Sequence, residues 1–115
     1  MSAATRDDAA GAVFTALADP TRRRIVRTLV EQGTATASSL ASGLPVTRQA
    51  VAKHLGVLAD AGLVAGERTG RETRYALTPA PLTDAMDWML RAGATWDARL
   101  DRLERQVAER RTAAP

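Results

Sequence analysis

The chain has 115 residues, no cysteine, one histidine and a formal net charge of +3. This length suits one domain with its own core, and the lack of thiols excludes disulfides and thiolate metal sites. A single histidine leaves most transition-metal sites without ligands, so we expect neither a metal nor a cofactor. No apolar run approaches the roughly 20 residues of a membrane span, and residues 1–8 show no secretory signal. We therefore expect a cytoplasmic protein.

Positive charge is concentrated in the middle of the chain. Residues 20–75 carry nine basic and four acidic side chains, a net of +5. Residues 1–19 have a net charge of −2, and residues 76–115 a net charge of 0. This asymmetry is typical of proteins that bind nucleic acid.

Two helices are predicted before residue 33. A short amphipathic helix over 8–18 has apolar side chains at helical spacing. Asp19 followed by Pro20 is a strong start signal for a second helix over 21–30, because it supplies an N-cap and a proline at the first helical position. Gly33 should end this helix. Its inward-facing side chains are Ile25, Val26 and Leu29.

A helix-turn-helix is expected next. Thr36 can cap a short third helix that runs through Leu40 and stops near Gly43. Residues 44–46 then turn the chain into a fourth helix. Two short helices joined by a turn of three to four residues, the second polar on its outer face, form a helix-turn-helix.

The fourth helix, within residues 46–64, is the most informative segment. Thr47 is a good N-cap, Gly62 ends the helix, and a strand follows at once. Positions i, i+4 and i+7 form a buried stripe of Val51, Leu55 and Leu58. Basic and amide side chains off this stripe can bind phosphates and base edges, and a helix fits the major groove. We interpret it as a DNA recognition helix with contacts from Thr47, Arg48, Gln49, Lys53 and His54.

A basic β-hairpin is predicted directly after the recognition helix. Residues 63–68 and 72–77 have strand patterns, and the Thr69-Gly70-Arg71 turn joins them. A hairpin in this position is the wing of a winged helix, and a basic tip suits phosphate or minor-groove contact. The expected wing contacts are Arg68, Arg71 and Arg74. Arg68 and Arg74 could equally form strand salt bridges with Glu67 and Glu72.

A long last helix is expected over about 82–110, after Pro79 and Pro81. Its apolar residues recur at spacings of three and four for three heptads, which is typical of a coiled-coil seam. A small domain does not need so long a helix, so we expect a second copy of the chain to pack on it. The seam consists of Met86, Met89, Gly93, Trp96, Leu100, Leu103 and Val107. The domain then covers 8–110, with flexible ends at 1–7 and 111–115.

The order of these motifs resembles ArsR-type winged-helix repressors over roughly residues 10–108. The most specific motifs are Leu17-Ala18-Asp19-Pro20-Thr21-Arg22, Lys53-His54-Leu55 with Leu58, Ala61-Gly62-Leu63-Val64, and Gly70-Arg71 before Tyr75. The resemblance implies a mainly α fold with a small β-hairpin (α+β), a winged helix-turn-helix of five helices plus the wing. It also implies a homodimer that occludes promoters and uses its first and last helices as the interface, which adds Phe14 and Leu17 to the expected dimer contacts.

Departures from that family concern the sensing sites. Founding members sense metals through cysteines in or near the third helix, or through Asp, His and Glu on the last helix. Residues 36–40 contain no thiol and the last helix has no histidine. The chain therefore resembles the cysteine-free branch, and we expect no metal site. Ala52 stands where many relatives have a serine, which removes one phosphate contact.

Several expected DNA contacts have an alternative role. Gln49 fits a bidentate contact to adenine, but it could be a solvated amide. Arg48 and Lys53 could read guanine or only hold phosphates. His54 could pack on the third helix or touch phosphate.

Alternatives also stay open outside the recognition helix. The arginines of 22–24 could contact DNA, or Arg22 or Arg23 could pair with Asp19. Trp88 and Trp96 could line an effector pocket in a dimer or belong to the interface core.

We therefore expect a sequence-specific repressor that binds double-stranded DNA as a homodimer, on an inverted-repeat operator, with autoregulation. The alternatives are a non-specific architectural DNA-binding protein and a winged-helix module that binds another protein. No constellation of residues supports an enzyme. The sequence names neither the operator nor a small-molecule effector.

Overall fold

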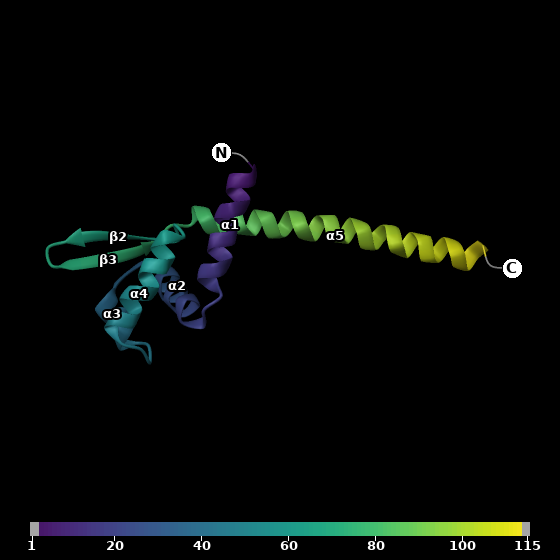
Figure 1. Ribbon diagram of the computed structural model, residues 1–115. Helices are drawn as coiled ribbons and strands as arrows, with labels where there is room; N and C mark the ends of the chain where they lie inside the picture. Colours follow the sequence, from purple (N-terminus) through teal and green to yellow (C-terminus); the bar gives the residue numbers. More distant parts are fainter. Residues whose placement is uncertain (1–2, 114–115) are drawn as a thin grey trace. The chain divides into compact units, whose positions relative to one another are not determined.

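The computed structural model describes residues 3–113, with side chains from residue 8 onwards. The chain divides into two compact units, Met1–Ala85 and Met86–Pro115, and Figure 1 labels the helices and strands. The elements are α1 (Ala3–Leu17), α2 (Pro20–Gln32), β1 (Thr34–Thr36), α3 (Ala37–Ser42), α4 (Arg48–Asp60), β2 (Val64–Thr69), β3 (Glu72–Leu77) and α5 (Ala80–Ala113).

The predicted caps of α2 are confirmed, although the helix extends past residue 30 to Gln32. The Asp19 carboxylate accepts the Arg22 N–H at 3.0 Å, and Pro20 occupies the first helical position. At the other end Gly33 has φ +85° and donates its N–H to the Leu29 carbonyl at 2.8 Å. A positive φ is a conformation that glycine adopts at little cost, so Gly33 ends the helix.

Capping side chains also determine where the two helices of the helix-turn-helix begin. Thr36 and Ser39 form a reciprocal capping box at the start of α3, with each side chain accepting the other's backbone N–H at 3.1 Å. Thr47 caps α4 by accepting the Ala50 N–H at 3.1 Å. The connection over residues 43–47 is longer than the predicted turn of three to four residues, because the Thr47 cap itself lies outside the helix.

The core of the first unit is built around the predicted stripe of α4. Val51, Leu55 and Leu58 are completely or almost completely buried. The large buried side chains around them are Val13, Ile25, Leu29, Leu40 and Leu63. On α1 the buried face consists of small residues and Val13, whereas Phe14 remains 37% exposed.

The sheet has three antiparallel strands in the order β1-β3-β2. The sequence predicted only the hairpin β2–β3, and omitting β1 was wrong. Three residues with one apolar side chain, the buried Ala35, give no alternation from which a strand could be inferred. Thr69 pairs with Glu72, so the turn consists of Gly70 and Arg71, and Gly70 has φ +64°.

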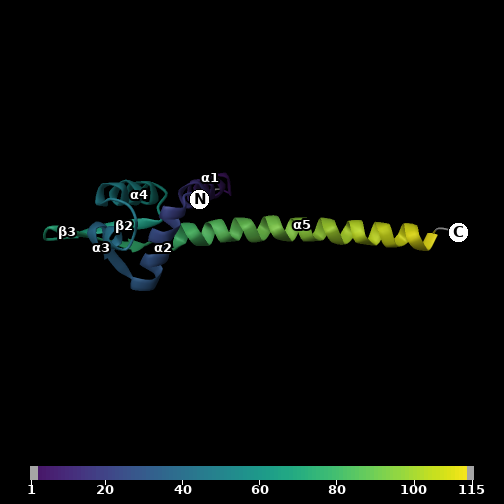
Figure 2. The same cartoon turned by 90° about the horizontal axis from the view of Figure 1, so that it is seen from below.

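The hairpin β2–β3 extends beyond α3 and α4 in both views of the molecule (Figures 1 and 2). Its turn is therefore the outermost part of that side of the first unit.

Both terminal helices are longer than predicted. α1 begins at Ala3 instead of residue 8, and α5 runs over Ala80–Ala113 instead of about 82–110. The predicted flexible segments fall partly on residues 1–2 and 114–115, which lie outside the described residues. Within the described range, no helix is long and apolar enough to cross a membrane.

The second unit is a single helix, the part of α5 that starts at Met86. Every described side chain from Met86 to Ala113 is exposed. Arg91 Nε and the Asp87 carboxylate form an i, i+4 ion pair at 3.3 Å.

Candidate nucleic-acid interface

The starts of α3 and α4 and the wing enclose an open groove of about 500 Å³. Its lining residues are Thr36, Ala37, Ser38, Arg48, Gln49, Ala52, Arg68, Arg71, Glu72, Thr73 and Tyr75. The fold thus brings together Arg48 and Gln49 from the helix with Arg68 and Arg71 from the wing. These are four of the eight predicted DNA contacts.

The outer face of α4 is opposite its buried stripe. Gln49, Ala52 and Lys53 stand at i, i+3 and i+4, so they share one face, and all three are exposed. Thr47 is exposed at the start of the helix, with its hydroxyl oxygen engaged by the Ala50 N–H. Lys53 is one helical turn after Gln49 on this face, but it is not among the residues that line the groove.

The strand register divides the wing arginines between two faces. Arg68 is opposite Thr73, and Gly66 is opposite Tyr75. Side chains alternate along a strand, so Arg68, Thr73 and Tyr75 share the face that lines the groove. Arg74 belongs to the other face, directly opposite Glu67. The register places Arg74 beside Glu67, and the predicted salt bridge between them stays a prediction.

Tyr75 is a groove residue that the sequence analysis missed. A Cβ on Gly66 would lie 3.0 Å from Tyr75 Cε1 and 2.9 Å from Thr73 Cγ2. Only glycine therefore lets the ring lie close against β2. Thr36 and Ser38 also line the groove without having been predicted. The alternation along β3 was the one signal that could have placed Tyr75 on this face.

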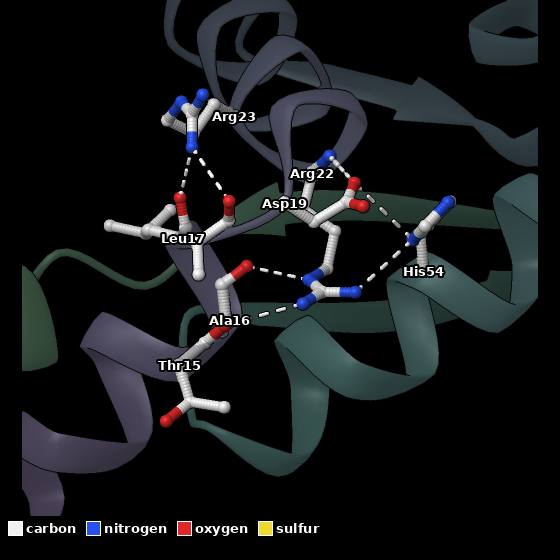
Figure 3. A network of polar contacts seen from close by, with 8 residues as sticks. Thr15, Ala16, Leu17, Asp19, Arg22, Arg23 and His54 are labelled. Atoms are coloured by element: carbon white, nitrogen blue, oxygen red, sulfur yellow. Dashed lines mark hydrogen bonds and ion pairs between the residues drawn. The ribbon is translucent and has the colours of Figure 1, made fainter.

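His54 lies on α4 beside the start of α2. Its Nδ1 is 3.9 Å from the Asp19 carboxylate and 3.5 Å from Arg22 Nη1 (Figure 3). The side chain is 22% exposed. The His54 ring therefore contacts the α1–α2 junction, a contact that neither of the two predicted roles included.

Arg22 and Arg23 bind the end of α1 (Figure 3). Arg22 donates from Nε to the Ala16 carbonyl at 2.5 Å and from Nη2 to the Thr15 carbonyl at 3.2 Å. Arg23 Nη1 donates to the Leu17 and Ala18 carbonyls at 2.7 and 3.0 Å. Helix ends leave such carbonyls without intrahelical partners and favour nearby cations. The predicted pairing with Asp19 is made by the Arg22 backbone N–H, while both guanidinium groups bind these carbonyls.

The pKa of Asp19 is held below its ordinary value. The hydrogen bond from the Arg22 N–H is the largest cause, and partial desolvation opposes it. Electrostatic attraction to His54 and Arg22 lowers the pKa further. The carboxylate is therefore ionised and available as a cap at neutral pH.

All of the predicted dimer residues except Leu17 are exposed within their own units. Met86 and Trp96 are each 57% exposed, and the remaining apolar seam residues are also exposed. Leu17 is half-buried on α1. Within the described residues, no three His, Asp or Glu side chains are grouped so that they could hold a metal ion.

Comparison with known proteins identifies the family. A helix-turn-helix domain family matches residues 17–67. The transcriptional repressor SdpR of Bacillus subtilis is 35% identical over 78 residues, covering 68% of this chain and 86% of that repressor. A solved ArsR-like transcriptional regulator from Rhodococcus sp. RHA1 is 43% identical, with a TM-score of 0.76 over 85% of this chain and 92% of the other. The chain belongs to the ArsR family of helix-turn-helix transcriptional regulators.

Membership of the ArsR family confirms the winged helix-turn-helix fold and a DNA-binding regulator that is not an enzyme. Another similar regulator is CmtR of Mycobacterium tuberculosis, 41% identical over 81 residues, or 70% of this chain and 68% of CmtR. CmtR is described in its solved structure as a cadmium sensor. The present chain has no cysteine at all.

Proposed function

We propose that this ArsR-family regulator is a repressor that binds an inverted-repeat operator as a homodimer and controls its own gene. The main observation behind the proposal is that Arg48 and Gln49 of α4 line the same groove as Arg68 and Arg71 of the wing. A helix with an amide and basic side chains at its start, beside an arginine-tipped hairpin, suits simultaneous contact with a major groove and the adjacent backbone.

The side chains divide into base-reading and phosphate-binding groups. Gln49 is exposed at the start of α4, and its amide can form a bidentate contact with adenine. Arg48 and Lys53 on α4 and Arg71 at the turn supply positive charge for phosphates. Arg68 adds charge on the groove face of the wing. Thr47 lies at the start of α4 beside this surface, and Arg74 lies on the opposite face of the wing. Their hydroxyl and guanidinium groups can bind the DNA backbone.

Homodimerisation is supported by the second unit. The seam of α5 repeats as a heptad, and all its apolar side chains are exposed in the single chain. An exposed apolar stripe of this length is typical of a protein interface. Two-fold symmetry would place two recognition helices about 34 Å apart, in successive major grooves.

Selection from a random-sequence duplex pool tests the proposal. The protein should enrich an imperfect inverted repeat, and a matching sequence should lie upstream of its own gene. Affinity for the enriched duplex should fall with salt, with a log–log slope of about −0.9 per phosphate contacted.

Two results would support the other functions. Equal affinity for the enriched duplex and a scrambled duplex would indicate an architectural protein. Salt-insensitive capture of a protein, without retention of DNA, would indicate an interaction module.

A further inference from the structure

Arg22 joins three helices through one guanidinium group. Its Nε and Nη2 donate to carbonyls in the last turn of α1, and its Nη1 lies 3.5 Å from His54 Nδ1 on α4. Arg22 itself belongs to the first turn of α2. The group therefore connects the end of α1, the start of α2 and the recognition helix (Figure 3).

Asp19 completes this connection from the loop between α1 and α2. Its carboxylate caps α2 through the Arg22 N–H and lies 3.9 Å from His54 Nδ1. The loop itself consists of only two residues, Ala18 and Asp19. The two groups that approach His54 thus come from this short loop and from the first turn of α2.

His54 is placed where it can control the orientation of the DNA-reading face. It is on α4 next to Lys53 and five residues after Gln49. Its neighbour Leu55 is fully anchored in the core, whereas His54 is only partly buried. A change in the contact at His54 would rotate or tilt the exposed face of α4 about its buried stripe.

Arg23 supplies an internal comparison. Its guanidinium also binds carbonyls at the end of α1, those of Leu17 and Ala18. Arg23 shares with Arg22 its positive charge, its place in the first turns of α2 and the backbone carbonyls as acceptors. Arg22 differs in its contact with α4 and in being partly buried, whereas Arg23 is exposed.

We propose that Arg22 and His54, held by Asp19, form a positioning junction that sets the orientation of the recognition helix relative to α1. His54 then acts on DNA recognition indirectly. This inference rests on the proposed function, since it requires α4 to read DNA. If α1 also belongs to the dimer interface, the junction links that interface to the reading face.

Substitution of the two arginines tests the junction. Arg22→Gln and Arg23→Gln each remove one positive charge and the guanidinium contacts to two backbone carbonyls at or just after the end of α1. The probes are the duplex that the unaltered protein enriches from a random pool and a scrambled duplex of equal composition. Arg22→Gln should reduce the ratio of the two affinities about tenfold. Arg23→Gln should leave this ratio within about twofold of its original value.

The salt dependence separates positioning from direct contact. Neither substitution should change the log–log slope, because neither arginine is placed on a phosphate. A slope that becomes about 0.9 less steep for Arg22→Gln would show a lost phosphate contact and overturn the proposal. Equal loss of discrimination in both variants would also overturn it, since the effect would then come from the α1 carbonyls.

His54→Phe tests the junction by removing the partner of Arg22 on α4. It also provides the test if Arg22→Gln does not fold. Phenylalanine keeps a ring but lacks the Nδ1 atom, so discrimination should fall as for Arg22→Gln. The double variant should be no worse than either single one, because both substitutions break one connection. Additive losses would overturn the proposal. Failure of the unaltered protein to enrich any duplex would instead refute the proposed function.

Discussion

Gln49 and Arg71 lie on different walls of one groove and differ in what they can recognise. Gln49 stands at the start of α4, where its amide can both donate to and accept from a base edge. Arg71 stands in the turn of the wing after Gly70 and is exposed. An amide has no charge to attract a phosphate, whereas a guanidinium has one. The two residues should therefore affect specificity and affinity separately.

Alanine substitution should reveal this separation. Gln49→Ala should reduce discrimination against a changed operator base by about 1–3 kcal/mol, with little change in the salt slope. Arg71→Ala should weaken binding to operator and scrambled duplex alike and make the slope about 0.9 less steep. Fluorescence anisotropy at several salt concentrations measures both quantities. The reverse pattern would show that the roles are exchanged.

At the scale of the elements, side-chain caps decide where the helices begin. Asp19, Thr36 and Thr47 each accept the backbone N–H of the residue three positions later. Each cap satisfies a donor that the first turn would otherwise leave without a partner. Because these bonds join residues close in sequence, the starts of α2, α3 and α4 could be predicted from the sequence.

Other features depend on contacts that are distant in sequence. β1 exists because Thr34–Thr36 pairs with β3 some forty residues later, and its three residues carry no periodic pattern. The place of Tyr75 in the groove depends on strand register and on the missing Cβ of Gly66. The junction of His54 with Asp19 and Arg22 joins side chains on different helices. The sequence therefore predicted the helix and the hairpin that form the candidate site, but it did not predict these partners.

The cap at Asp19 should make the stability of the protein depend on pH. Its folded pKa is lowered, chiefly by the Arg22 N–H, from an unfolded value of about 3.9. The carboxylate therefore stabilises the fold above that value, and the contribution is lost as the pH falls through the folded pKa. Asp19→Ala should lower the free energy of unfolding at neutral pH. The difference from the unaltered protein should shrink below about pH 4.

Urea unfolding at several pH values measures this effect. Asp19→Asn is the matched control, because asparagine keeps a capping oxygen without the charge. Its difference from Asp19→Ala should stay nearly constant with pH. A difference between the unaltered protein and Asp19→Ala that does not change with pH would contradict the electrostatic part of the argument.

At the scale of the whole molecule, the two units have different sources of stability. Met1–Ala85 buries an apolar core between helices and sheet. Met86–Pro115 has no buried side chain among its described residues, yet it carries a heptad of large apolar side chains. Apolar surface in such a stripe is stabilised when a partner removes it from water. The charge distribution fits this division between the units. The net positive charge lies in residues 20–75 of the first unit, whereas residues 76–115, which contain the seam, have equal numbers of acidic and basic side chains.

A charge placed in the seam should separate the proposed dimer. Leu100→Asp would bury a carboxylate between two helices, and the dimer dissociation constant should rise on the order of 100-fold. Ala98→Asp adds the same charge to the same helix, two residues away and off the heptad seam. It should therefore leave the dimer intact. Sedimentation velocity over a range of concentrations measures both dissociation constants. The affinity of Leu100→Asp for the duplex should also fall, because in a monomer the two recognition helices no longer bind together. A Leu100→Asp protein as dimeric as Ala98→Asp would place the interface elsewhere on the chain.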